Sequence, residues 1–325
     1  MKYGLTAAIL GSGYIGEQYL EILSGLVERV ILCSNDEAKG RALSQKYRCD
    51  FYMDYEELYR QETPDFVCIC LPTNLHCDAT VKALESGFHV LCEKTFASSV
   101  EEAELMLNTA KRNQKNLMIG QVARFSKAYE YLKRCISDRR FGELLYMEFY
   151  RHSDTPLWSV GGWLQDVSRS GGVLRDLHIH DTDALVGLLG LPEGVYTVGG
   201  DTVCRSVYTY AAGKSVSASA SWRNAKDFPF YMGYDVVFEN ATLQRQGDDV
   251  ILYKSGTAEN PLENENFSEF FKNDDSLYNE LNYFCYVIEN GIIPELCPPE
   301  ETLKTMLLNR SEAVSLKSGK EVKIC

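Results

Sequence analysis

The sequence contains no apolar run that approaches the roughly 20 residues needed to cross a membrane as a helix. Its N-terminus also lacks the basic region, apolar core and small-residue cleavage site of a secretory signal peptide. We therefore expect a cytoplasmic protein. Lys and Arg number 33 against 46 Asp and Glu, which gives 325 residues a net charge of −13. Because this charge repels phosphate backbones and anionic lipids, we expect neither nucleic acid nor a membrane as a partner.

Paired cysteine motifs are also missing, although the chain has eleven cysteines. No CxxC pair occurs, and several cysteines lie in apolar, strand-like runs such as VCIC (67–70). Reduced, mostly buried thiols are the simplest interpretation. The spacing of a zinc site is absent as well, and we predict no metal.

Residues 1–122 alternate between strand-like and helix-like segments. The apolar run LTAAIL (5–10) leads into GSGYIG at Gly11–Gly16, and a helical apolar pattern follows. In this context Gly11 permits a tight turn, Gly13 lets the backbone approach a pyrophosphate, and Gly16 lets the helix pack on the strand. The alternation continues to a strand at 117–120. It predicts an α/β domain with a doubly wound parallel sheet, a Rossmann domain.

Ligands of such a sheet bind at the carboxyl ends of its strands, where LPTNLH (71–76) and CEKTF (92–96) are found. The second strand ends in Ser34-Asn35-Asp36, with Lys39 and Arg41 nearby. With no carboxylate directly after that strand, the composition slightly favours NADP over NAD, although Asp36 could still reach a ribose 2′-hydroxyl. The residues expected to bind the cofactor are Gly11, Gly13, Tyr14, Ile15, Gly16, Ser34, Asn35, Leu71, Pro72, Thr73, Asn74, His76, Glu93 and Lys94.

The pattern changes after Gly120. Segments at 143–151, 213–222, 234–240 and 249–254 read as strands, and 213–222 alternates polar and apolar residues as a half-buried strand does. Helical patterns occupy 126–137, 277–291 and 299–314. We predict a Rossmann domain at 1–122. An α+β domain with a large, mainly antiparallel sheet follows at 123–325, and its last helix, about 299–317, can pack back onto the first domain.

The stretch GGVLRDLHIHDTDAL (171–185) concentrates two histidines and three aspartates between Asp176 and Asp183. On one helix Asp176, His180 and Asp183 share a face, whereas His178 lies elsewhere. This window alone leaves several interpretations open. It could hold a catalytic acid–base group, a buried histidine satisfied by Asp176, a solvated acidic face or a zinc site.

The combination of GSGYIG, LPTNLH, EKT (93–95), GGVLRDLHIHDTD and SLKSGKEVKI (315–324) resembles the Gfo/Idh/MocA family of NAD(P)-dependent sugar and polyol oxidoreductases. The form D-x-x-x-H-D-x-D is most similar to its inositol dehydrogenase branch. The resemblance implies that Lys94 bridges cofactor and substrate, that Asp176 orients the sugar and the histidine, and that His180 exchanges the proton. An imidazole suits that exchange, and an ammonium stabilises a developing alkoxide.

The sequence departs from the family pattern at two positions near these residues. Thr95 replaces the usual proline, which leaves the pose of Lys94 open, and His178 replaces a small residue, which suggests a narrower or more polar pocket. The substrate-binding residues implied are Arg124, His152, Trp163, Asp176 and His180, with Tyr150, Asp154 and Trp158 also flanking the expected cleft. A sugar or polyol substrate and a homodimer or homotetramer follow by resemblance. The alternatives are an NAD-dependent glycoside hydrolase of the same family and a non-catalytic sensor of cofactor and sugar.

Overall fold

The computed structural model describes residues 2–157, 159 and 162–324, and the chain divides into two compact units. The first unit consists of Met1–Val122 and Asp275–Leu303, and the second of Ala123–Asp274 and Lys304–Cys325. The sequence predicts one continuous second domain from residue 123 onward. In the structure, by contrast, residues 275–303 return to the first unit.

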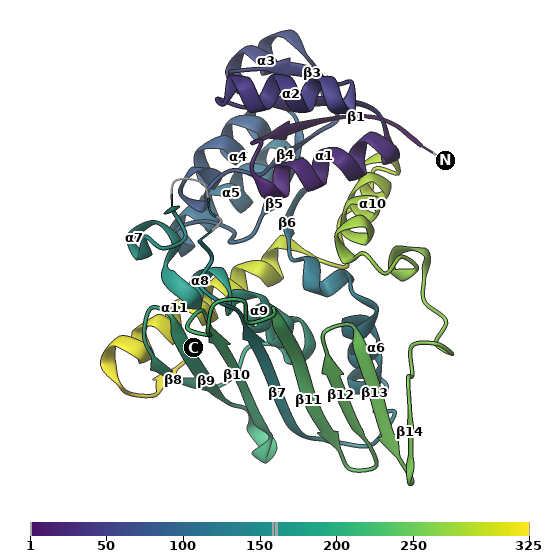
Figure 1. The fold of residues 1–325 in the computed structure, drawn as a ribbon, viewed down its shortest axis with the longest axis vertical. Coiled ribbons are helices and arrows are strands. Elements are labelled where there is room, and N and C mark those ends of the chain that lie inside the picture. The colour runs from purple at the N-terminus through teal and green to yellow at the C-terminus, as the bar shows by residue number, and fades with distance from the viewer. Residues whose placement is uncertain (1, 158, 160–161, 325) are drawn as a thin grey trace. The chain divides into compact units, whose positions relative to one another are not determined.

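The first unit contains a six-stranded parallel sheet of order β3-β2-β1-β4-β5-β6 (Figure 1). Its strands are β1 (Tyr3–Leu10), β2 (Val27–Cys33), β3 (Asp50–Tyr52), β4 (Phe66–Ile69), β5 (His89–Glu93) and β6 (Leu117–Gly120). Its helices are α1 (Tyr14–Leu26), α2 (Glu37–Tyr47), α3 (Tyr55–Gln61), α4 (His76–Glu85), α5 (Val100–Asn113) and α10 (Ser276–Glu289). The predicted doubly wound sheet is confirmed, and its strand order reverses between β1 and β4.

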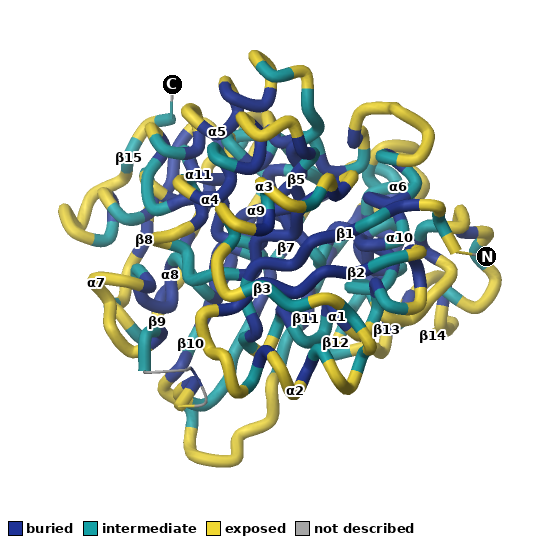
Figure 2. Tube along the Cα trace, turned by 90° about the horizontal axis from the view of Figure 1, so that it is seen from above, coloured by how far each residue is buried: buried dark blue, intermediate teal, exposed yellow. Residues whose placement is uncertain are grey.

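Local sequence explains where these elements begin and end. The side chains of Asp36, Asp54 and Ser99 accept hydrogen bonds from the first free backbone N–H groups of α2, α3 and α5. Every residue of β4 and β6 is buried, as expected for strands covered on both faces. Buried strand residues form dark blue segments in Figure 2, and yellow exposed loops surround them.

Helix α10 joins the first unit although it lies more than 150 residues beyond β6 in the sequence. It contacts α1 and β1, and its Phe284 ring packs edge-on against Phe66 with centroids 5.4 Å apart. The Tyr3 hydroxyl donates to the Asn282 side chain over 2.9 Å. An amphipathic pattern identifies a helix but not the surface that buries it, and so the sequence placed this helix in the other domain.

The second unit contains a nine-stranded sheet of order β14-β13-β12-β11-β7-β10-β9-β8-β15 (Figure 1). All neighbours pair antiparallel except β7 and β10, so the predicted mainly antiparallel sheet is confirmed. The strands are β7 (Leu144–His152), β8 (Gly194–Gly199), β9 (Val203–Thr209), β10 (Ser215–Ser221), β11 (Tyr231–Phe238), β12 (Thr242–Gln246), β13 (Asp249–Lys254), β14 (Thr257–Glu259) and β15 (Val322–Lys323).

Helices cover one face of this sheet. They are α6 (Lys127–Ser137), α8 (Gly172–Asp176), α9 (Ile179–Leu189) and the part of α11 (Pro299–Ser318) that follows Leu303, while the short and largely exposed α7 (Val167–Ser170) precedes and contacts α8. Along β9 exposed and buried residues alternate strictly, because successive side chains point to opposite faces. In the described part of the chain, no helix is both long enough and apolar enough to span a bilayer.

Candidate active site

The glycine loop follows β1 at the point where the strand order of the first sheet reverses. Gly11 has φ +111°, and a Cβ there would lie 2.3 Å from the Cys70 carbonyl oxygen, so only glycine fits. A Cβ on Gly16 would lie 2.1 Å from the Gly11 carbonyl oxygen. Gly11 and Gly16 are therefore required for the turn and for packing of α1 on the sheet, as predicted from the sequence.

Gly13 differs from both of them. Its backbone is extended, with φ −65° and ψ −171°, and no described heavy atom lies within 4 Å of a Cβ built on it. Neither conformation nor packing within the chain requires glycine here. The exposed start of α1 with an open approach fits a ligand phosphate held by backbone N–H groups at a helix N-terminus.

We therefore expect Gly13→Ala to leave the melting temperature nearly unchanged but to weaken dinucleotide binding at least about tenfold, or about 1.4 kcal/mol. The matched control is Gly25→Ala, a second open glycine in α1, which should preserve affinity and stabilise the helix by roughly 0.5–1 kcal/mol. Fluorescence titration and thermal unfolding of both variants check this. Equal cofactor affinity in Gly13→Ala and the unmodified protein would refute the pyrophosphate assignment.

The end of β2 is built from small hydroxyl side chains. Ser34 is buried, its Oγ lies 2.7 Å from the Oγ of Ser12, and it accepts the backbone N–H of Asp36 over 3.1 Å. The carboxylate of Asp36 accepts the backbone N–H of Lys39 as the cap of α2. The Lys39 ammonium lies 3.9 Å from a Glu17 oxygen.

The loops after β4 and β5 are tied together by His76. Its buried imidazole places Nδ1 2.8 Å from the Thr95 carbonyl oxygen and Nε2 2.8 Å from the Leu71 carbonyl oxygen. Burial lowers the pKa of His76, so the neutral ring donates one N–H to one of these carbonyls. Thr95 is buried, and the Lys94–Thr95 peptide bond is cis. His76 is thus placed to fix the LPTN and EKT loops relative to each other.

The side chain of Glu93 contacts the backbone of Lys94. Its carboxylate accepts the Tyr19 hydroxyl over 2.7 Å and the Lys94 backbone N–H over 3.1 Å, and only 8% of the residue is exposed. Burial and the neighbouring Glu93 charge raise the pKa of Tyr19, which keeps that hydroxyl a donor. These contacts show Glu93 supporting the loop that carries Lys94. Direct contact of Glu93 with a cofactor stays a prediction, as does that of Thr73 and the exposed Asn74.

The central motif does not form the single helix that its spacing suggests. Helix α8 ends at Asp176 and α9 begins at Ile179. Between them the His178 N–H bonds the Val173 carbonyl five residues back, a wider turn than an α-helix makes. Asp176 and His180 therefore belong to two different helices, and their four-residue spacing does not by itself place them on one helical face. Both residues belong to the second unit and are partly exposed.

Asp183 interacts with Arg124 and Thr305. It receives Nε and Nη2 of Arg124 over 2.7 and 2.9 Å and the Thr305 hydroxyl over 2.8 Å, and the two charged side chains are almost fully buried. Such bidentate pairing is strong and geometrically specific. It gives Arg124 a structural role within the second unit, while its predicted role in substrate binding stays a prediction.

His178 points into the interior and not into a pocket. It is fully buried, and its Nε2 lies 3.1 Å from Glu312 Oε1 and 3.2 Å from the Tyr208 hydroxyl. The Tyr208 hydroxyl, the Thr182 hydroxyl and the Asn309 amide also donate to the Glu312 carboxylate. We expected His178 to make the substrate pocket narrower or more polar, but its ring is buried in the interior. Instead it links the α8–α9 junction to α11.

Charge stabilises this buried pair in its ionised form. Burial alone would lower the pKa of His178, but Cys204 and Glu312 beside it raise that pKa well above its usual range. Burial alone would raise the pKa of Glu312, whereas His178 and the hydrogen bonds from Tyr208 and Asn309 hold it below its usual range. Both shifts, with the 3.1 Å contact, favour a salt bridge between an imidazolium and a carboxylate.

His152 lies on the face of the sheet opposite to α9. Its neighbour Arg151 takes the helix side, donating to Asp181 over 2.9 Å, and strand alternation sends His152 to the other face. There His152 Nε2 lies 3.3 Å from the Ser219 hydroxyl, beside the stacked rings of Tyr150 and Tyr231 at 4.9 Å. Sequence reasoning missed Arg151, although alternation along β7 could have identified it.

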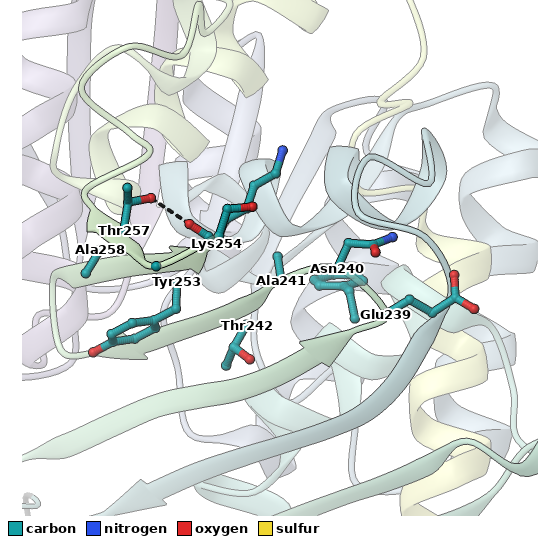
Figure 3. Close-up of a pocket in the computed structure, with 11 residues that line it drawn as sticks. Glu239, Asn240, Ala241, Thr242, Tyr253, Lys254, Thr257 and Ala258 are labelled. Carbon is teal, nitrogen blue, oxygen red and sulfur yellow. Dashed lines mark hydrogen bonds between the residues drawn. The ribbon is translucent and has the colours of Figure 1, made fainter.

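The remaining predicted residues lie in the segment after β7. Asp154 and Trp163 are partly exposed, and Trp158 lies outside the described residues. A hollow of about 490 Å³ is formed elsewhere by the turns between β11 and β12 and between β13 and β14 (Figure 3). It contains none of the predicted site residues. Among the described residues no cluster of three or more His, Cys, Asp or Glu could hold a metal ion.

Comparisons with known proteins agree with this architecture. A family profile described as "Oxidoreductase family, NAD-binding Rossmann fold" matches residues 5–121, and a "GFO/IDH/MocA C-terminal domain" profile matches residues 129–244. The solved structure of a levoglucosan dehydrogenase in complex with NADH and levoglucosan has a TM-score of 0.86 at 16% identity, covering 99% of both chains. That likeness shows the fold.

Two sequence relatives differ in the reaction that their names state. A 2,7-anhydro-N-acetylneuraminate hydratase from Mediterraneibacter gnavus is 31% identical over 195 residues, or 60% of this chain and 52% of that protein. An inositol 2-dehydrogenase from Rhizobium meliloti is 28% identical over 193 residues, or 58% of this chain and 55% of that protein. The chain thus spans about half the length of the curated relatives that it matches.

Proposed function

Because the chain belongs to the Gfo/Idh/MocA oxidoreductase family, we propose that it is an NAD(P)-dependent dehydrogenase or reductase of a sugar, sugar derivative or cyclitol. The observation that carries the proposal is the cofactor loop. Gly11 and Gly16 are required by the fold, whereas Gly13 is open to a ligand at the switch point of a doubly wound sheet. NAD binding is a property of this fold family, and the nicotinamide supplies the hydride chemistry.

The chain supplies proton transfer and charge stabilisation. We assign the general base in oxidation, and the acid in reduction, to His180, because a neutral imidazole can accept the carbinol proton near neutral pH. We assign Lys94 to the reacting oxygen, where an ammonium stabilises developing negative charge. Asp176 orients the sugar and His180. Support comes from the partial exposure of Asp176 and His180 and from the buried Glu93 that fixes the Lys94 backbone.

The second candidate is a lyase or hydrolase that oxidises, eliminates and re-reduces its substrate with no net change in cofactor. This candidate is supported by the similar protein from Mediterraneibacter gnavus, which is named a hydratase and not a dehydrogenase. The earlier expectation of a glycoside hydrolase belongs to the same class of redox-neutral outcomes. The same catalytic side chains serve both candidates, so the protein geometry alone does not separate them.

A panel of sugars, sugar acids and cyclitols, each with NAD and with NADP, separates these candidates. Absorbance at 340 nm that rises in proportion to keto product supports the dehydrogenase. Conversion of a sugar without net change at 340 nm supports the redox-neutral alternative. Binding of cofactor and sugar with no conversion of any panel member would support the sensor.

We expect NADP to bind more tightly than NAD, and Ser34→Asp to reverse this order. Ser34 is small and neutral, and the Asp36 carboxylate caps α2. Lys39 is partly exposed and Arg41 is exposed, and both pair with glutamates on the surface. Such pairs are weak, so both cations can turn to a 2′-phosphate. Fluorescence titration measures both affinities, and tighter binding of NAD by the unmodified protein would remove the basis for this preference.

We further propose a cytoplasmic homodimer or homotetramer. The uncovered face of the second sheet carries exposed apolar side chains on β8 and β9, a surface that a second subunit could bury. These residues are Tyr196, Val198, Val203 and Val207. Light scattering tests the assembly, and a monomer at micromolar concentration would overturn it.

A further inference from the structure

A small cavity lies between the covered face of the second sheet and helices α6 and α9. It has a volume of about 20 Å³, room for one particle near the size of a water molecule. Its lining combines aromatic and apolar side chains with three charged ones, Arg151, Asp181 and Arg245. The formal charges of these three side chains sum to +2 − 1 = +1.

The guanidinium of Arg151 has its own partners. Its Nη2 donates to Asp181 Oδ1 over 2.9 Å, its Nε lies 3.3 Å from Oδ2, and its Nη1 lies 3.1 Å from the Met232 sulfur. The side chains of Arg151 and Asp181 are 12% and 2% exposed. The charges of Arg151 and Asp181 therefore balance each other, and the charge of Arg245 remains.

Arg245 lacks a comparable partner. Its Nε donates to the Gly247 carbonyl oxygen over 2.7 Å, but no described carboxylate lies within ion-pair distance of its guanidinium. In the sheet register Arg245 pairs with Tyr234, and Met232 pairs with Arg151, so the two arginines reach the cavity from strands on either side of β11. Burial lowers the pKa of Arg245 more than the nearby charges of Asp248 and Asp181 raise it.

We propose that this cavity is a binding site for one small inorganic anion of the size of chloride. Arg245 is partly buried, a cation withdrawn from water without an ion-pair partner is unfavourable, and an anion beside it would bring the net charge of the lining to zero. Charge-assisted hydrogen bonds from the guanidinium would hold it. The positive lining excludes a metal cation, and the small volume excludes a sugar or a nucleotide. This inference is independent of the proposed redox reaction.

Thermal unfolding at constant ionic strength tests the site, with sodium chloride or bromide replacing sodium gluconate. A ligand that binds only the folded state raises stability by mass action, so we expect a saturable rise of roughly 2–4 °C in chloride and bromide. Arg245→Met should abolish this rise. The matched control is Arg205→Met, which removes an exposed arginine paired with Glu148 on the open face and should keep the full response.

Equal melting temperatures in chloride and gluconate would overturn the site and leave the cavity to a water molecule. An equal halide response in Arg245→Met and Arg205→Met would overturn it as well, because the effect would then arise elsewhere. If Arg245→Met fails to fold, crystals of the unmodified protein grown in bromide replace the variant. An anomalous peak within reach of both arginines supports the site, and its absence at saturating bromide refutes it.

Discussion

Replacing His180 with alanine should lower kcat by roughly 10²–10⁴, the usual contribution of a positioned acid–base group. Cofactor affinity should change little, because the residues proposed to hold the dinucleotide belong to the first unit and His180 to the second. Stability should fall only modestly, since the side chain is partly exposed. Measuring kcat, cofactor affinity and melting temperature on one sample separates a catalytic histidine from a structural one.

Lys94→Ala provides the second arm of this experiment. It should also lower turnover, and the combined loss in the double variant should be smaller than the product of the single losses, because both groups are proposed to act on one reacting oxygen. A metal-dependent reaction predicts instead that chelators abolish activity of the unmodified enzyme. Near-normal turnover of His180→Ala with its true substrate would mean that another residue is the base.

Breaking the buried His178–Glu312 pair should give the largest loss of stability, about 3–5 kcal/mol, because one charge is left uncompensated in the interior. His178→Gln exposes this cost by leaving the Glu312 carboxylate without its counter-charge. Adding Glu312→Gln removes that charge, so the double variant should be more stable than His178→Gln. Denaturant unfolding of the single and double variants measures the difference, and a double variant less stable than His178→Gln would contradict the ionised pair.

The pair also predicts a pH dependence. The raised pKa of His178 contributes stability that is complete below 6.5 and is lost as the pH rises toward the folded-state value. The lowered pKa of Glu312 contributes stability that is complete above 4.5 and is lost at lower pH. Stability from the pair is therefore greatest between those values. Above pH 6.5 the free energy of unfolding should decline by at most about 1.4 kcal/mol per pH unit.

His89→Gln is the matched control for this slope. Burial lowers the pKa of His89, so its titration affects stability only as the pH falls. The alkaline decline should persist in His89→Gln and be reduced in His178→Gln. An identical alkaline slope in these two variants would exclude His178 as its source.

Much of the architecture could be predicted because it rests on local signals. Glycines with defined spacing, buried apolar runs and period-two alternation identify the Rossmann sheet and the strands β7, β10, β11 and β13. Short strands such as β3, β14 and β15 carry too few residues to show a period. The return of α10 to the first unit depends on which surface buries it, and a helical pattern contains no such information.

The candidate site was harder to predict for the same reason. Asp183 lies at helical spacing from His180, yet its partner Arg124 comes 59 positions earlier in the chain. Glu312, which holds His178, lies 134 positions later. A charged residue can be interpreted as solvated or catalytic until its partner is known. A short motif contains no information about partners that lie far away in the sequence. The face of β7 that His152 occupies follows from strand alternation, which was not counted when the residue was chosen for its chemistry, and its role in substrate binding stays a prediction.

The most direct test of the central claim follows deuterium from the carbinol carbon of a substrate found in the panel. If the chain catalyses net oxidation, the deuterium should appear on the nicotinamide ring of the reduced cofactor, one equivalent for each keto product, by NMR and mass spectrometry. Deuterium retained in a dehydrated, hydrated or hydrolysed sugar, with no accumulation of reduced cofactor, would contradict a net dehydrogenase.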